Sequence, residues 1–392
     1  MTKVQAENKI TFFPVGNGDT TLLSFKDGTN FLIDCNITKD SGDPKIEERY
    51  DLVTHLLSIL PRDLNNFPHL DVFMLTHPDI DHCRSFSKHF YLGDPTKYNK
   101  ELDKDKIIVD ELWFAPGIFT EKMSELNDEA KKFRNEGRRR MKLYEDKDKN
   151  RSDSGNRLRV IGDTDNSKFD EVKKITTKAG ESVNLINGKI QSDLNILVLW
   201  PEKYITDDNE SERNERSIVI KVEFSVNGDD VNNVVILGGD SRIENWKSII
   251  EKFDVGNLKF DIFLAPHHCS WYFFSDLDYK SEPSPNPDDI MVSFVENGKD
   301  SEDIRVIVAS CKEIKRNEDN PPHYRAANIY KKAVKDENFY CLSEYPDKEK
   351  PKPLVFKFTE NGPIKEDPVN DSGKSNDNIL IQTASKPKTY GV

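Results

Sequence analysis

The apolar positions of the first hundred residues fall into short runs separated by turn residues, a pattern typical of β-strands. Two of these runs, residues 10–15 and 20–25, flank a Gly-Asn-Gly-Asp segment at residues 16–19, which predicts a hairpin. Apolar residues then recur at helical spacing over residues 45–60 and stop at Pro61, so we expect a helix there. Further short strands are predicted at residues 31–33 and 72–75.

The second half of the chain repeats this order of strands followed by helices. We expect one helix over residues 243–253, with Ser241 as its N-cap, and another over residues 324–335. Two successive groups of strands and helices indicate an α/β protein in which two sheets pack together with helices outside them. Strands are predicted at residues 196–200, 217–224, 234–237, 260–265 and 305–309.

A highly charged segment separates the two halves. Residues 121–159 are dominated by Lys, Arg, Glu and Asp, and we expect an exposed helix from about Glu121 to Tyr144. The run Arg138-Arg139-Arg140 would suit nucleic acid, but a solvated helix face in a mixed-charge insertion is the preferred interpretation. We place this insertion at about residues 117–160 of a single domain, 1–358. It could contact a protein partner or a second copy of the chain. Residues 359–392 are expected to form a flexible tail.

Composition and charge narrow the possible functions. Of the 392 residues 35% are hydrophobic and 32% charged, which allows a substantial core surrounded by many polar loops. The net charge of −13 repels polyanions, so contact with nucleic acid would need a local basic groove or metal ions. The chain starts without a signal-like segment, and no apolar run approaches the roughly 18 residues that cross a bilayer. Its five scattered cysteines are typical of reduced thiols, and we expect a cytoplasmic protein with no membrane contact.

The densest set of metal-type ligands is His77-Pro78-Asp79-Ile80-Asp81-His82, which directly follows an apolar strand. A loop held at the edge of a rigid sheet can bring several donors to one point. Imidazole suits Zn, Fe or Mn, whereas carboxylate oxygens favour harder ions such as Mn or Mg. The alternative interpretation is a polar turn that caps a helix, and the interleaving of two histidines with two acids weighs against it.

Two later segments offer further ligands at strand ends. Asp240 follows an apolar strand, where a carboxylate could bridge two metal ions, although alone it would more often be a turn or cap residue. His267 and His268 also end an apolar strand. Adjacent side chains of an extended backbone point in opposite directions, so we expect one of the two to bind metal and the other to contact either substrate or the residues that support the metal ligands. Which one binds metal stays open, and all three strand ends are predicted to converge in space.

These motifs, taken in order, resemble the metallo-β-lactamase superfamily, and within it the soluble hydrolase domain of the competence protein ComEC and its stand-alone relatives. The superfamily motif HxHxDH is matched by residues 77–82, with Asp79 in place of the second histidine. The mid-chain histidine ligand of the superfamily is missing, and Asn214 is the nearest candidate. The other matching segments are residues 15–19 (VGNGD), 32–35 (LIDC), 214–217 (NERS), 239–240 (GD), 266–270 (PHHCS) and 320–323 (NPPH).

The resemblance implies a four-layer αββα sandwich that binds two divalent metal ions, Mn or Zn, with Mg also suitable. It implies a metal-activated water that hydrolyses phosphodiesters, with DNA or another nucleic acid as the preferred substrate. Two alternatives remain: a small nucleotide or phosphocholine-type ester as substrate, and a catalytically degenerate scaffold domain. The expected metal ligands are His77, Asp79, Asp81, His82, Asp240 and His268, and the expected catalytic residues are Asp81, His267 and His323, with His323 as proton donor.

Overall fold

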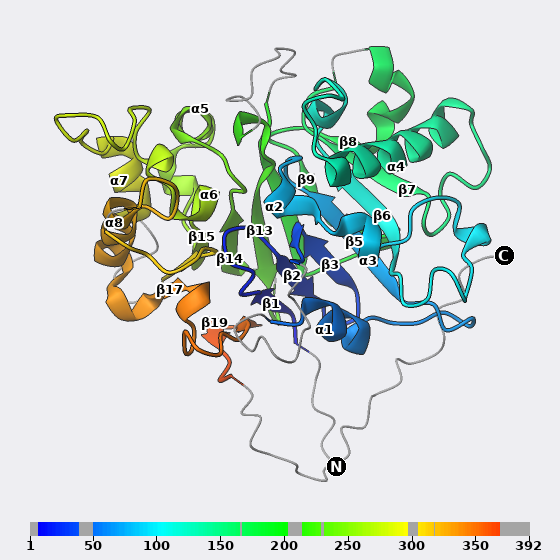
Figure 1. Ribbon diagram of the computed structural model, residues 1–392, viewed down its shortest axis with the longest axis horizontal. Helices are drawn as coiled ribbons and strands as arrows, with labels where there is room; N and C mark the ends of the chain where they lie inside the picture. Colours follow the sequence, from blue (N-terminus) through cyan, green and yellow to red (C-terminus); the bar gives the residue numbers. More distant parts are fainter. Residues whose placement is uncertain are drawn as a thin grey trace, which may run out of the picture.

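The chain is a mixed α/β protein built on two large β-sheets (Figure 1). The computed structural model describes residues 7–38, 50–164, 167–202, 214–228, 231–296, 305–316 and 318–368.

The first sheet combines the N-terminal part of the chain with its last described strands. Its strand order is β19-β18-β1-β2-β3-β5-β6-β7-β8. The strands from β3 to β8 run parallel, and the others pair antiparallel. The bounds are β1 Lys9–Phe12, β2 Thr21–Ser24, β3 Asn30–Ile33, β5 His69–Leu75, β6 Ile108–Phe114, β7 Arg157–Ile161, β8 Thr176–Thr177, β18 Leu354–Thr359 and β19 Gly362–Lys365.

The second sheet has the order β17-β16-β15-β14-β13-β12-β9. Its strands β14 to β17 run parallel, whereas β9, β12, β13 and β14 pair antiparallel. The bounds are β9 Ser182–Val183, β12 Leu194–Trp200, β13 Val219–Ser225, β14 Val231–Leu237, β15 Ile262–Leu264, β16 Val306–Ala309 and β17 Phe339–Cys341. Outside both sheets lie β4 Cys35–Asn36 and the small hairpin of β10 Leu185–Ile186 and β11 Lys189–Ile190.

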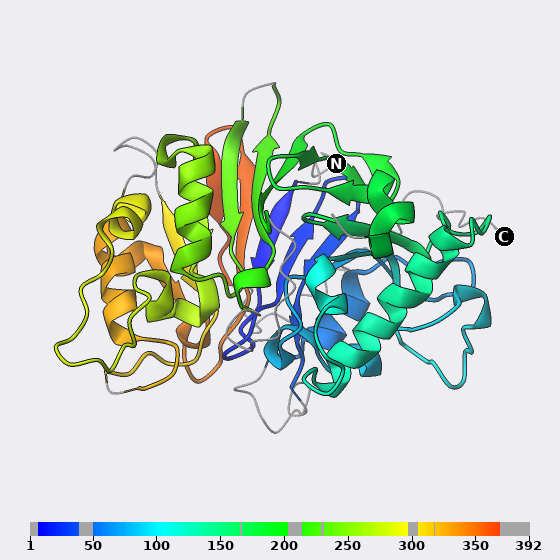
Figure 2. The same cartoon turned by 90° about the horizontal axis from the view of Figure 1, so that it is seen from above.

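Three apolar clusters hold the sheets and helices together. One contains residues of both sheets, such as Val72 and Val222, and therefore lies between them. A second joins the other face of the first sheet to α1 and α4, and a third joins the second sheet to α5, α7 and α8 (Figure 2). Each large apolar side chain contributes about 1.5–3 kcal/mol by leaving water. The helices are α1 Leu52–Ile59, α2 Ile80–Cys83, α3 Phe86–His89, α4 Asp128–Glu145, α5 Ile243–Phe253, α6 Pro266–Cys269, α7 Asp289–Glu296 and α8 Tyr324–Val334.

Helix α4 corrects the prediction of an exposed helix in the charged segment. Its narrow apolar face, which includes Phe133 and Met141, packs into the cluster on the first sheet. Arg140 is buried on the same face, where its guanidinium donates to Glu136 and to the carbonyl oxygens of Val109 and Arg157. The segment predicted as an insertion at residues 117–160 thus supplies both a strand, β7, and a covering helix to the first sheet. A contact between this segment and a partner protein or a second copy stays a prediction.

Other predictions stand as follows. The N-terminal hairpin is confirmed, since β1 and β2 pair antiparallel. The helix predicted over residues 45–60 begins at Leu52 with Asp51 as its N-cap, and residues 39–49 lie outside the described part. The predicted tail begins too early at residue 359, because β19 pairs with β18, and residues 369–392 lie outside the described part. Within the described residues, no helix is long and apolar enough to cross a membrane.

Candidate metal centre

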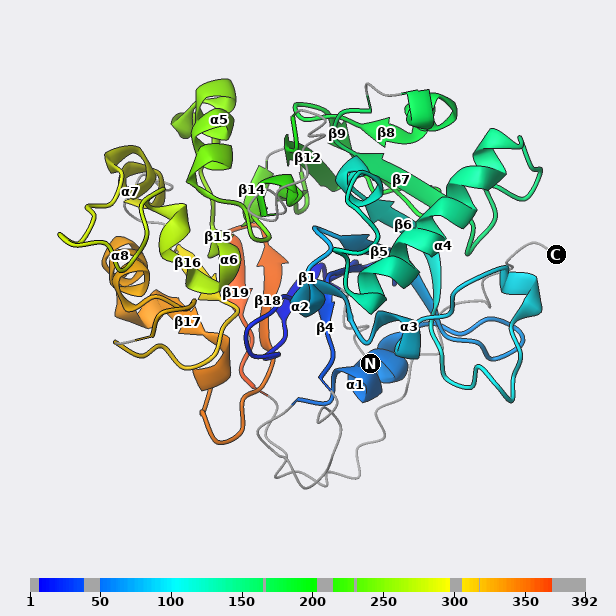
Figure 3. The same ribbon diagram turned by 45° about the horizontal axis from the view of Figure 1, so that its top comes forward.

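The segments with metal-type ligands follow the carboxyl ends of parallel strands, where open α/β sheets generally bind ligands. His77 comes soon after β5 in the first sheet, and Asp240 and His267 come soon after β14 and β15 in the second. The short helices α2 and α6, which carry His82 and His268, lie toward the middle of the molecule (Figure 3). The carboxyl ends of strands in the two sheets therefore bring these segments together.

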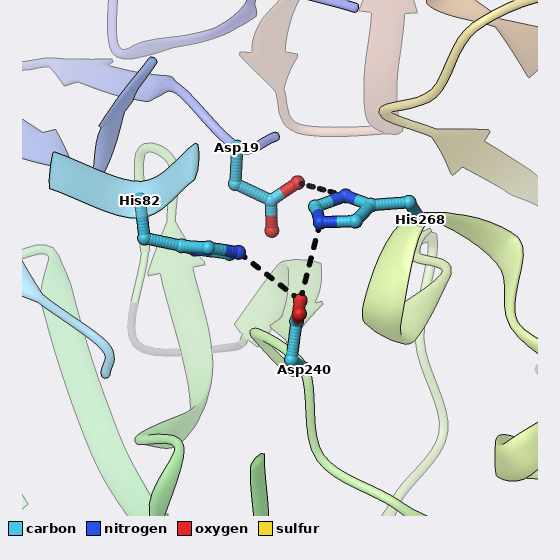
Figure 4. Close-up of side chains that lie close together, drawn as sticks. All are labelled: Asp19, His82, Asp240 and His268. Carbon is cyan, nitrogen blue, oxygen red and sulfur yellow. Dashed lines mark ion pairs between the residues drawn. The ribbon is translucent and has the colours of Figure 1, made fainter. Parts of the chain in front are cut away.

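Asp240 is the centre of the resulting cluster. Its Oδ1 lies 3.2 Å from Nε2 of His82 and 3.6 Å from Nε2 of His268 (Figure 4). Its Oδ2 lies 3.6 Å from Nε2 of His77 and 3.6 Å from Nε2 of His267. One carboxylate thus faces a pair of imidazoles with each of its oxygens.

Two further carboxylates border the cluster. Oδ2 of Asp81 lies 3.3 Å from Nε2 of His268, and Oδ2 of Asp79 lies 3.7 Å from Nε2 of His77. The side chains of Asp79 and Asp81 are 31% and 26% exposed, whereas those of His77 and His82 are fully buried. The acids of the motif therefore mark the side from which solvent reaches the cluster.

The cluster has the chemistry of a cation site. Asp19, His82, Asp240 and His268 are buried and each offers a ligand atom, all within 4.8 Å of one another (Figure 4). In the described part of the chain, the Nε2 atoms of His77, His82 and His268 make no hydrogen bond of good geometry and face only the more distant oxygens of neighbouring carboxylates. A buried polar atom left unpaired costs about 1–3 kcal/mol, a cost that coordination of a cation would offset. Imidazole nitrogens and carboxylate oxygens are the donors that Zn²⁺ and Mn²⁺ accept. This group could therefore hold a metal ion.

His82 is oriented by Asp34, a residue whose role sequence reasoning missed. Asp34 is fully buried, and its Oδ2 accepts a hydrogen bond from Nδ1 of His82 at 2.7 Å. Its Oδ1 accepts from the backbone N–H of Thr76 at 2.8 Å, and its Oδ2 also from the Thr76 hydroxyl at 2.6 Å. Asp34 keeps a proton on Nδ1, so when the imidazole is neutral its Nε2, 3.2 Å from Asp240, has a lone pair free for a cation. A carboxylate behind a histidine is the usual support for a histidine that binds metal.

Asp19, also missed as a ligand, is brought to the cluster by the loop between β1 and β2. The side-chain amide of Asn36 donates to the carbonyl oxygens of Val15 and Asn17, which holds this loop against β4. Gly18 has a φ of +139°, and a Cβ there would lie 2.2 Å from Nδ2 of Asn36, so only glycine fits. The tight loop leaves Oδ1 of Asp19 3.5 Å from Nδ1 of His268.

The backbone of the histidine pair corrects the expectation that only one imidazole points inward. His267 and His268 both have left-handed conformations, with φ of 49° and 54°, and Cys269 continues them at 68°. In this conformation, unlike in an extended strand, both rings reach Asp240. Left-handed residues cost about 1–2 kcal/mol each. The turn is held by the hydrogen bond from His267 N–H to the carbonyl oxygen of Gly239 at 2.9 Å and by burial of Cys269.

The electrostatics of the cluster favour charged groups in the metal-free protein. Burial opposes ionisation of Asp240, but the neighbouring His268 and His82 outweigh it and hold the pKa of Asp240 well below its usual value. Burial and His82 disfavour protonation of His77, yet Asp240 raises the pKa of His77 to about 9. For His267, burial dominates and lowers the pKa to about 4, so its imidazole is neutral at pH 7. Burial also opposes protonation of His82 and His268, but Asp240 outweighs it and raises the pKa of both well above the usual value. A cation must therefore displace protons from His77, His82 and His268 but not from His267.

His323 lies beside the histidine turn rather than at Asp240. Its backbone N–H donates to the carbonyl oxygen of Cys269 at 3.0 Å, and its Nδ1 accepts from the backbone N–H of Trp271 at 2.8 Å. Its ring packs against that of Tyr279 with centroids 4.3 Å apart and planes tilted by 38°. These contacts favour a role in positioning the turn, and proton donation by His323 stays a prediction without support from them.

Asn214, the nearest candidate for the missing mid-chain ligand, begins a 3₁₀ turn before β13. Its carbonyl oxygen accepts from the backbone N–H of Ser217, whose hydroxyl accepts from the backbone N–H of Asp240 at 3.1 Å. Among the described contacts none joins the Asn214 side chain to the cluster. The turn therefore supports Asp240 through Ser217.

The chain was compared with family models and with curated proteins, and neither comparison gave a match.

Proposed function

We propose that the protein is a metal-dependent phosphodiesterase with the four-layer fold of the metallo-β-lactamase superfamily, and that it hydrolyses nucleic acid. The observation that carries this proposal is the division of donors around Asp240. One of its oxygens faces His82 and His268, and the other faces His77 and His267. Such a division suits two cations that share one bridging carboxylate.

Each side of the carboxylate would hold one ion. Asp19, Asp81, His82 and His268 would bind the ion at Oδ1, and His77, Asp79 and His267 the ion at Oδ2. Bound divalent ions lower the pKa of a bound water to near 7 and neutralise charge on phosphoryl oxygens. No covalent nucleophile is then required, and all five cysteines are buried.

The chain's own residues contribute orientation and proton balance. Asp34 holds His82 in the tautomer that presents Nε2 to Asp240. His267 is neutral at pH 7, so it can bind a cation without losing a proton. Asp79 and Asp81 are the cluster acids most open to solvent, so a phosphodiester would approach past them.

The layering of the protein supports the fold part of the proposal. Apolar clusters lie between the two sheets and between each sheet and its helices, as the four-layer sandwich requires. The resemblance in the motifs supports nucleic acid as substrate. The net charge of −13 favours a second candidate, a small phosphodiester such as a nucleotide or a phosphocholine-type ester, because it needs no basic groove. The retained donors argue against a degenerate scaffold.

Elemental analysis and a metal-by-substrate screen would test the proposal. The purified protein would be loaded with Mn²⁺, Zn²⁺ or Mg²⁺ and given circular single-stranded DNA, duplex DNA or bis-p-nitrophenyl phosphate. We expect His82→Ala to lose metal and at least about 100-fold of the activity. His55→Ala is the matched control, since His55 bonds to Tyr50 far from the cluster in sequence. A metal-loaded protein that cleaves none of these substrates, or a fully active His82→Ala variant, would contradict the proposal.

A further inference from the structure

Arg242 lies two positions after Asp240, at the start of helix α5, and its backbone is rigidly held. Its N–H donates to the side-chain oxygen of Asn245 at 2.8 Å. The hydroxyl of the preceding residue, Ser241, donates to the carbonyl oxygen of Gly238 at 2.7 Å and accepts from the indole N–H of Trp246 at 2.8 Å. The polypeptide therefore fixes where the long side chain of Arg242 begins, directly beside the bridging carboxylate.

The described part of the chain holds no acceptor for the guanidinium group of Arg242. Among the described residues, no hydrogen bond or ion pair involves it, and its Nε is buried without a partner. Arg140, by contrast, donates to Glu136 and to backbone carbonyl oxygens. Buried donors of a charged group are normally paired because leaving them unpaired is costly. An arginine that breaks this rule next to a cluster of metal-type ligands is a candidate for binding an anion.

An aromatic ring fixes the position of this guanidinium. The Cζ atom of Arg242 lies 4.9 Å from the centroid of the Tyr272 ring. Tyr272 follows the histidine turn, and its backbone N–H donates to the hydroxyl of Ser270 at 3.2 Å. The neighbouring Trp271 N–H is held by Nδ1 of His323 at 2.8 Å. A guanidinium that stacks on a ring keeps its in-plane donors free for a ligand and loses little entropy when it binds one.

The position of His267 shows which side of the cluster lies nearest to Arg242. The backbone N–H of His267 donates to the carbonyl oxygen of Gly239 at 2.9 Å, so His267 lies against the segment that leads to Arg242. His267 is also the most exposed histidine of the cluster, with 18% of its side chain accessible. Arg242 therefore lies near the Oδ2 side of Asp240, where solvent reaches the site.

We propose that Arg242, held against Tyr272, binds a phosphate group at the His267 side of the cluster and makes the site specific for phosphate esters. A planar guanidinium forms paired, charge-assisted hydrogen bonds with two phosphate oxygens, which a lone ammonium cannot reproduce. This inference deepens the proposed function and depends on it for the identity of the substrate, but not for the binding of phosphate itself.

The test measures phosphate binding and catalysis separately. Binding of inorganic phosphate to the Mn²⁺-loaded protein would be followed by calorimetry, and kcat and KM measured with bis-p-nitrophenyl phosphate. We expect Arg242→Gln to weaken phosphate binding about 10–100-fold and to raise KM by a similar factor. Arg242→Lys, which keeps the charge, should recover only part of the loss. Arg316→Ala is the matched control, because it removes another arginine–tyrosine stack, on Tyr324 at 5.0 Å, and should leave both quantities unchanged.

The outcomes separate the two proposals. The inference is overturned if wild-type protein binds no phosphate, or if both Arg242 variants bind it as wild type does and keep its KM. If phosphate binding depends on Arg242 but no phosphodiester is hydrolysed, the inference stands and the proposed function fails. Thermal unfolding of each variant identifies misfolding, and Arg242→Lys then decides the result if Arg242→Gln is unfolded.

Discussion

Replacing Asp34 with asparagine tests whether a buried carboxylate, through its hydrogen bond to His82, determines the metal affinity of the site. Asp34 uses both oxygens: Oδ1 accepts the Thr76 N–H, and Oδ2 accepts the Thr76 hydroxyl and Nδ1 of His82. An asparagine that keeps its oxygen toward the Thr76 N–H turns its NH₂ group toward His82. Nδ1 must then accept a hydrogen bond, so the proton moves to Nε2, the atom that faces Asp240. In the other orientation of the amide, its NH₂ group faces the backbone N–H of Thr76, so two donors oppose each other.

Either orientation should weaken metal binding. Loss of a carboxylate behind a ligand histidine costs about 10–100-fold in metal affinity, or about 1.4–2.7 kcal/mol. The affinity would be measured at pH 7.5 by titration with Zn²⁺ or Mn²⁺ against a competing chelator. Asp71→Asn is the matched control, since Asp71 is equally buried in the first sheet and accepts hydrogen bonds from Asn30 and Asn187. It should cost stability without changing metal affinity. An Asp34→Asn variant that folds and binds metal as tightly as wild type would refute the reasoning.

Three further predictions follow from the structure. Arg140→Ala removes a buried guanidinium that donates to Glu136 and to the carbonyl oxygens of Val109 and Arg157, although Arg139 still pairs with Glu136. It should lower the free energy of unfolding by about 2–4 kcal/mol in urea titration, whereas Arg138→Ala, which removes an exposed pair, should change it by less than about 1 kcal/mol. Equal effects of the two changes would contradict the burial of Arg140. Gly18→Ala should displace the loop that carries Asp19 and weaken metal binding, and unchanged affinity would show that this loop does not shape the site. Because His77 of the metal-free protein is protonated below a pKa of about 9, and the pKa values of His82 and His268 are raised as well, metal affinity should rise with pH from 6 to 8 by up to about tenfold per unit for each displaced proton, and a flat dependence would disprove the competition.

The strands and helices with a clear apolar pattern were predictable from the sequence. Helix α5 begins and ends where its apolar spacing places it, at Ile243 and Phe253. Strand β6 was not found because it carries Asp110 and Glu111 in its middle. Both acids are buried and paired, Asp110 with Nδ1 of His69 at 2.6 Å and Glu111 with the backbone N–H of Asn187 at 2.7 Å. Partners so far apart along the chain give no local signal that a charged residue lies inside a sheet.

The site was predictable where its residues stand at strand ends. His77, His82 and Asp240 were identified because each is near a short apolar run. Asp34 stands in the same position after β3 and could have been found by the same rule. Asp19 could not, because a turn acid between two strands is ordinary, and only the packing of Gly18 shows how close its loop comes to His268. Whether the assembled donors bind metal stays a prediction.

The donors of the cluster are widely spread along the polypeptide, so the site can form only after most of the chain has been synthesised and has folded. Residue 82 is synthesised long before residues 240 and 268, so a chain emerging from the ribosome holds only fragments of the binding site. An unfolded or half-made chain therefore lacks the complete set of donors and should bind an ion more weakly than the folded protein does. By mass action a ligand at a concentration 100 times its Kd would stabilise the native state by about 2.7 kcal/mol. Starvation for the ion would then appear as increased degradation of the protein as well as reduced turnover.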